Sequence, residues 1–283
     1  MHSFPANHPA PRASFRTGLR RLRCCLLVLV LLLPVRAAAT EAEAWQLLAG
    51  YLFRDAYEVF ERAPAGSRTR ELGLAASLLN DPPVTGGKIA DAEARLRQLV
   101  AADGSDDAAM YARLLLARIV HLHREAPIPE VEAAYRAVLQ ADARHPAAQV
   151  AASRLALVML YQRPDLAVPQ RLAEAAAFAE IAGAATLPEA ACAYYRSLAS
   201  AALYYDVCDE QVLAWLQRAD AIGSEDPIVA ANLRIQLAEV ARLLGRRTEA
   251  VAYYRRFLDS ILPTDNRYLT ARERMQELEG MAP

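Results

Sequence analysis

The chain has 283 residues, of which 54% are hydrophobic and 23% are charged, and its formal net charge is −1. This balance excludes a strongly basic, nucleic-acid-binding protein. Apolar residues recur at spacings of three and four almost throughout, and alternating β-branched runs are nearly absent, so we expect an all-α fold.

The N-terminal segment, from Met1 to Ala39, has the pattern of a secretory signal. Five arginines precede a charge-free apolar stretch, residues 24–35, and small residues follow Arg36 up to Ala39. The stretch is about 12 residues long, whereas a membrane-spanning helix needs roughly 20. We therefore expect cleavage after Ala39, no stable membrane insertion of the mature chain, and a periplasmic or secreted location.

The expected mature chain is acidic. Cleavage removes six arginines and no acidic residue, which leaves 26 basic and 33 acidic residues and a net charge of −7. Such a product is unsuited to non-specific nucleic-acid binding. Two cysteines remain, Cys192 and Cys208, and most of the interval between them is predicted to be one helix. Their separation along it would be about 20 Å, so we expect both to be buried and unpaired.

A helical hairpin with a period of about 40 residues recurs along the mature chain. Pro146, Pro188 and Pro227 each open an Ala-rich helix, and they follow one another at nearly this period. Proline at the first helical position loses no intrahelical hydrogen bond. The six predicted hairpins are 41–50 with 53–62, 69–79 with 89–102, 106–124 with 129–141, 146–161 with 169–182, 188–205 with 209–222, and 227–244 with 248–262. A period of this length is typical of stacked repeats.

Side chains at the predicted helix ends support this division. Asp226 is placed to cap the helix that begins at Pro227, and Ser105 is expected to cap the first helix of the third hairpin. Gly223 and Gly245 stand where helices end and a left-handed residue is needed.

The last hairpin resembles a tetratricopeptide repeat (TPR). The matching residues are a small residue in the first helix, a turn glycine, a Glu-Ala pair opening the second helix, an aromatic residue and a closing proline: Ala238, Gly245, Glu249, Ala250, Tyr254 and Pro263. Arg234 stands where that family has an early tryptophan, the closing proline comes slightly late, and the other hairpins match more weakly.

The resemblance implies a right-handed superhelical solenoid of about six antiparallel hairpins. It also implies that the first helix of each hairpin lines a concave face that binds a protein or peptide partner. We expect residues 40–264 to form this TPR-like domain. Residues 265–283 are expected to form a C-terminal capping helix and tail, with the polar helix at 267–278.

Four arginines are the candidate partner-binding residues. Arg113, Arg154, Arg196 and Arg234 recur at close to the period of the hairpins, each in the first helix of a successive hairpin. Such a row on the concave face would receive carboxylates or a peptide C-terminus by forked hydrogen bonds. The alternative is that they pair with acidic residues of adjacent helices or face solvent. A register error of one residue rotates a side chain by about 100°.

Motifs for catalysis or cofactor binding are absent from the sequence. His121 and His123 would point about 200° apart on a helix, so they cannot ligate one ion together. Gly86-Gly87-Lys88 is predicted to be a plain loop. We therefore expect no catalytic residue, no metal and no cofactor.

Three tyrosine pairs, 194–195, 204–205 and 253–254, are predicted to pack between hairpins. Adjacent helical residues face about 100° apart, so we expect one tyrosine of each pair in the core and the other partly exposed. The alternative is an aromatic contact for a peptide or a glycan.

The predicted function is that of an exported, non-catalytic TPR-like scaffold for a protein or peptide partner. One alternative is a structural subunit of a cell-envelope assembly. Another is a glycan-active enzyme of the α-helical toroid type, which needs acidic residues converging on an aromatic cleft. Trp45 and Trp215 are the only tryptophans available for it.

Overall fold

The computed structural model describes residues 40–102, 104–183 and 187–280, and the expected signal at 1–39 lies outside them. These residues form fourteen helices and no strand. In chain order the helices are α2 (Glu41–Ala49), α3 (Phe53–Arg62), α4 (Arg68–Asn80), α5 (Gly86–Ala102), α6 (Asp107–His123), α7 (Ile128–Ala141), α8 (Pro146–Tyr161), α9 (Val168–Ala176), α10 (Ala179–Gly183), α11 (Pro188–Tyr204), α12 (Glu210–Ile222), α13 (Pro227–Leu243), α14 (Arg247–Leu258) and α15 (Tyr268–Gly280).

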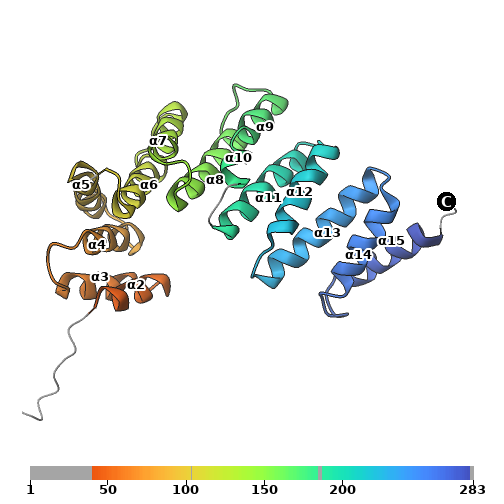
Figure 1. Cartoon of the computed structure of the whole chain (residues 1–283), viewed down its shortest axis with the longest axis horizontal. Helices are drawn as coiled ribbons and strands as arrows, with labels where there is room; N and C mark the ends of the chain where they lie inside the picture. Colours follow the sequence, from red (N-terminus) through yellow and green to blue (C-terminus); the bar gives the residue numbers. More distant parts are fainter. Residues whose placement is uncertain (1–39, 103, 184–186, 281–283) are drawn as a thin grey trace, which may run out of the picture.

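The helices follow one another in a curved, single-file array, with α2 and α3 at one end and α15 at the other (Figure 1). The two helices of each hairpin pack as antiparallel neighbours. Each of the first helices α2, α4, α6 and α8 also packs against the first helix of the next hairpin, α8 doing so against α11. No such packing is recorded between successive second helices in the described residues, so the first helices lie on the inner side of the curve. The predicted all-α solenoid is confirmed.

Helix ends follow local chemistry. Asp226 caps α13 as predicted, because its carboxylate accepts hydrogen bonds from the backbone N–H groups of Ile228 at 2.8 Å and Val229 at 3.4 Å. The prediction for α6 was wrong by one residue. Asp106, not Ser105, is the cap, and it accepts from the backbone N–H of Ala109 at 2.8 Å.

Gly223 and Gly245 have φ angles of 84° and 72°, as predicted for residues that end helices in the left-handed region. The prediction of a loop at residues 86–88 was wrong, because α5 begins at Gly86. Lys88 holds this start in place by donating to the carboxylate of Asp81 at 2.6 Å and to its backbone oxygen at 2.8 Å.

The second helix of the fourth hairpin is broken into α9 and α10, contrary to the single helix predicted over 169–182. The Tyr194 hydroxyl donates to the carbonyl of Ala175, and the Tyr195 hydroxyl donates to that of Ala179 at 2.9 Å. An uninterrupted helix would use the Ala175 carbonyl for the N–H four residues later. The break therefore comes from hydroxyls on a different helix.

This use of hydroxyls also explains one wrong expectation for the tyrosine pairs, since Tyr194 and Tyr195 are both buried. The last pair behaves as predicted, with Tyr254 in the core and Tyr253 half-buried. The prediction was also wrong for the middle pair, because neither ring lies in the core: Tyr204 is 72% exposed and Tyr205 is half-buried.

The core continues along the array and closes at both ends. One cluster joins α2 to α4, a second joins α4 to α6, and a third extends from α6 to α15. At the first end, the Phe60 ring packs edge-on against Trp45, with centroids 5.3 Å apart. At the other end, α15 buries Ala271 and presses Met275 and Leu278 against the core, as expected for a capping helix.

Glu239 joins the last three helices. Its carboxylate accepts hydrogen bonds from the Tyr254 hydroxyl at 2.5 Å, from Arg242 at 3.1 Å and from Arg274. Burial would raise the pKa of Glu239, but these three hydrogen bonds outweigh it and hold the pKa below the ordinary value of 4.5.

Candidate functional site

The inner side of the first three hairpins carries an apolar groove of about 380 Å³. Every lining residue belongs to a first helix, α2, α4 or α6. The apolar lining residues are Trp45, Leu48, Leu72, Ala76, Ala108, Tyr111, Leu114 and Leu115. Four polar residues complete it: Thr69, Asn80, Asp107 and Arg118. We call this site the inner groove.

Arg118 is the cation of the inner groove. Its Nη2 reaches the amide oxygen of Asn80 at 3.5 Å, and it forms no ion pair with any residue that the structure describes. Burial lowers the pKa of Arg118, and the nearby charge of Arg154 on α8 lowers it further. Two cations thus lie near each other, and no carboxylate among the described residues compensates them.

Two further polar groups lie beside these arginines. The Nδ1 of His121 lies 3.0 Å from the hydroxyl of Tyr135, and its Nε2 lies 3.5 Å from the amide nitrogen of Gln162. Burial lowers the pKa of His121, and the charge of Arg154 adds to that effect, so the imidazole is neutral at pH 7. Together, Arg118, His121, Tyr135 and Arg154 form what we call the Arg118 cluster.

The charges in the Arg118 cluster favour an anion. The charged neighbours that shift the pKa of Arg118, His121 and Tyr135 are members of the cluster itself. Both ring nitrogens of His121 are engaged by Tyr135 and Gln162, and Tyr135 is fully buried. The two guanidinium groups are therefore the hydrogen-bond donors open to an incoming oxyanion. The arrangement therefore joins an apolar groove to an anion-binding end.

The pattern of buried residues shows which positions in successive first helices are structurally equivalent. We call the number of residues between equivalent positions the register shift. The eight buried residues of α11 lie 43 positions after buried residues of α8. The six buried residues of α13 lie 39 positions after buried residues of α11. Six of the seven buried residues of α6 match α8 at a shift of 39.

This register separates the four predicted arginines. Arg113 and Arg234 occupy equivalent positions, whereas Arg196 is equivalent to Ser153, and Arg154 to Ser197. Among them only Arg154 is exposed, and it alone belongs to the Arg118 cluster. Arg113 faces the other side of α6, where its Nη2 donates to the carbonyl of Gly104 at 3.1 Å.

None of the four arginines forms an ion pair within the described part of the chain. The Nε groups of Arg113, Arg196 and Arg234 are buried without a hydrogen-bond partner in the described residues. Pairing with acidic residues of adjacent helices, the alternative weighed from sequence, is therefore not observed there. A partner-binding role for the four remains a prediction.

Sequence reasoning missed Arg118 and the aromatic lining of the inner groove. A signal was present, because Tyr111, Leu115 and Arg118 recur at spacings of four and three and so share one face of α6. This signal is local to α6, because Arg118 does not recur from hairpin to hairpin as the four predicted arginines do.

Over the described ranges, no group of His, Cys, Asp or Glu side chains is arranged to hold a metal ion. In the same ranges no helix combines the length and apolar character that crossing a bilayer requires. Comparison of the sequence with known protein families and with curated proteins returns no match.

Proposed function

We propose that this protein is an exported, non-catalytic TPR-like scaffold that binds a protein or peptide partner on its inner, concave face. The observation that carries the proposal is the inner groove, an apolar channel built from three successive first helices that ends at the Arg118 cluster. Export to the periplasm or beyond rests on the signal pattern of residues 1–39.

The TPR-like assignment draws support from the last hairpin. Ala238 and Tyr254, two of the residues that carry the resemblance, are fully buried between helices. Gly245, a third, adopts the left-handed conformation that its turn requires.

The inner groove suits a peptide with an apolar side chain followed by a carboxylate. Burying a large apolar side chain against Trp45 and Tyr111 is worth about 1.5–3 kcal/mol, whereas an exposed ion pair is worth at most about 1 kcal/mol. The apolar contact therefore supplies most of the affinity, and Arg118 with Arg154 supplies orientation and selectivity for the anionic end.

The direct test uses labelled synthetic peptides that end in leucine or phenylalanine, with either a free carboxylate or an amide at the C-terminus. We expect the free acids to bind about fivefold more tightly in fluorescence anisotropy, which corresponds to about 1 kcal/mol. The double variant Arg118→Glu, Arg154→Glu should lose this preference. Arg272→Glu is the matched control, because Arg272 is exposed on α15, far along the array.

The natural partner is then sought by affinity capture from an envelope extract with the same three proteins. A partner retained by the wild type and by Arg272→Glu, but lost from the double variant, supports the proposal. Equal affinity for acid and amide peptides, together with capture unaffected by the double variant, would refute it.

A further inference from the structure

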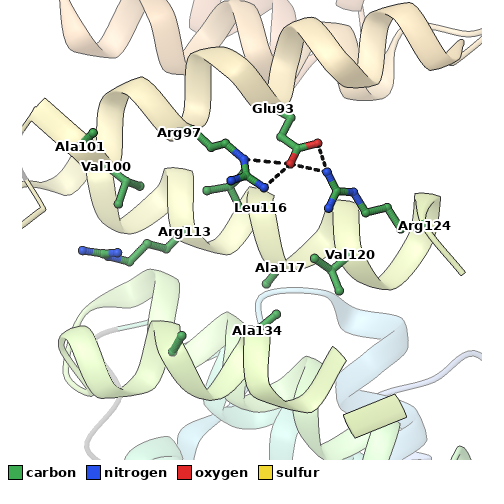
Figure 2. A pocket seen from close by; sticks show the side chains of 11 residues that line it. Glu93, Arg97, Val100, Ala101, Arg113, Leu116, Ala117, Val120, Arg124 and Ala134 are labelled. Atoms are coloured by element: carbon green, nitrogen blue, oxygen red, sulfur yellow. Dashed lines mark hydrogen bonds and ion pairs between the residues drawn. The ribbon is translucent and has the colours of Figure 1, made fainter. Parts of the chain in front are cut away.

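The outer side of α6 carries a second apolar depression of about 490 Å³, between α5 and α7. Its floor on α6 includes Leu116, Ala117 and Val120, and its walls include Val100 from α5 and Ala134 from α7 (Figure 2). We call it the outer trough. The residues of α6 that line it lie on the face opposite those that line the inner groove.

The equivalent face is covered in the three first helices that follow α6, namely α8, α11 and α13. Leu116 and Val120 are half-exposed. At the corresponding positions of α8, Leu155 and Met159 are 0% and 1% exposed. The corresponding residues of α11 and α13 are also buried: Leu198, Ala202, Leu237 and Ala241. The outer trough is therefore a place where a covering present elsewhere in the array is missing.

The outer trough is long enough to hold a helix. The trough extends along α6 from Arg113 to Arg124, about three helical turns or about 16 Å. An apolar stripe at spacings of three and four along one side of it is the surface that a second helix packs against.

The charged residues at the rim of the outer trough favour a helix with acidic ends. At one end, Arg97 and Arg124 share the single carboxylate of Glu93, with Arg97 at 2.7 Å. At the other end lies Arg113, whose Nε has no hydrogen-bond partner in the described residues and which forms no ion pair there. Three guanidinium groups and one carboxylate leave the rim with a net charge of +2, in a chain whose overall charge is −1.

We propose that the outer trough docks an amphipathic helix of a partner protein, whose apolar stripe of about three turns is flanked by an acidic residue at each end. The apolar side chains cover Leu116, Ala117 and Val120, and the acidic ends meet Arg113 and the Arg97–Arg124 pair. This surface is separate from the inner groove, and the proposal does not depend on the function proposed for the groove.

The test is a display library of helical peptides about four turns long, selected on the purified protein and counter-selected on the variant Val120→Asp. We expect enriched sequences with an apolar stripe and acidic residues at both ends. Their affinity should fall at least tenfold on Val120→Asp and on Ala134→Tyr, which fills the trough without adding charge. Ile228→Asp, at a residue 67% exposed on α13, is the control and should leave binding unchanged.

Charge exchange tests the complementarity directly. Arg113→Glu should weaken an enriched acidic peptide at least tenfold, and a peptide with lysine in place of the acidic residue at that end should regain the affinity. Circular dichroism verifies that each variant remains folded.

Three results would overturn the proposal: no enrichment of trough-dependent peptides, enriched peptides without acidic ends, or binding that Val120→Asp and Ala134→Tyr leave unchanged. A wild-type dimer that Val120→Asp converts to a monomer in sedimentation equilibrium would also overturn it, because the occupant would then be a second copy of this chain.

Discussion

The ring of Phe60 lies against the backbone of Gly73, so that a Cβ atom added at Gly73 would sit 2.2 Å from the ring Cζ. Glycine is therefore required where α3 and α4 cross, although it is a poor helix former. Gly73→Ala should displace the ring and lower the free energy of unfolding by about 1–3 kcal/mol, more than the roughly 1 kcal/mol gained in helix propensity.

Thermal unfolding followed by circular dichroism measures this effect. Gly87→Ala is the matched control, since the nearest atom to an added Cβ there is 4.0 Å away, and it should be neutral or stabilising. Phe60→Leu should restore part of the stability lost in Gly73→Ala. An alanine variant at residue 73 as stable as the wild type would contradict the packing described.

Glu239→Gln should destabilise the C-terminal end of the array by about 2 kcal/mol at pH 7, because a neutral amide forms weaker hydrogen bonds with Arg242 and Arg274. The folded-state pKa of Glu239 is lowered, so the unfolded chain takes up the proton first as the pH falls. The stabilisation is complete above pH 4.5 and is lost as the pH falls through the folded-state pKa.

Urea unfolding between pH 7 and pH 3 checks this prediction. The difference between wild type and Glu239→Gln should shrink as the pH falls below 4.5. Glu273→Gln removes an exposed carboxylate from α15 and should have little effect at any pH. A constant difference at all pH values would show that the charge of Glu239 does not matter.

His121 should titrate below its ordinary pKa of 6.5, and Arg154→Ala should move its pKa upward by removing a neighbouring positive charge. Because the folded-state pKa is lowered, the neutral imidazole stabilises the fold fully above pH 6.5, and this contribution is lost as the pH falls through the folded-state value. NMR titration, with His121→Gln for assignment, measures the shift. Arg144→Ala should leave it unchanged, and an unchanged pKa in Arg154→Ala would separate Arg154 from the Arg118 cluster.

The two cysteines of the described residues are free thiols, as predicted, but the expected burial holds only for Cys192, because Cys208 is half-buried. Burial raises the pKa of both thiols, and Cys192 is 2% exposed. We expect Cys192 to resist a thiol reagent in the folded protein, Cys208 to react slowly, and both to react on unfolding without a reductant. Cys208→Ser should abolish the slow reaction in the folded state. A requirement for reductant would show that the thiols are oxidised.

Helix positions could be predicted from the sequence because their signals are local. Pro188 and Pro227 begin α11 and α13 where the sequence placed them, since proline fixes φ and lacks only a hydrogen bond that the first turn does not make. The break between α9 and α10 could not be predicted in this way, because it depends on hydroxyls that Tyr194 and Tyr195 bring from another helix.

The candidate sites were predicted less well than the helices. The spacing from Arg113 to Arg154 is two positions longer than the register shift from α6 to α8, and the spacing from Arg154 to Arg196 is one position shorter than the shift from α8 to α11. A discrepancy of one position already turns a side chain by about 100° around its helix. Only coordinates of the packed hairpins reveal that Arg118, and not Arg113, faces the inner side of α6.

Helix α6 contributes residues to both candidate sites, one on each of two opposite faces. The inner groove and the outer trough are separated by its thickness alone, about 10 Å. Partners bound to both sites at once would contact opposite faces of this one helix. A rigid displacement of α6 toward either side would therefore narrow one site and widen the other.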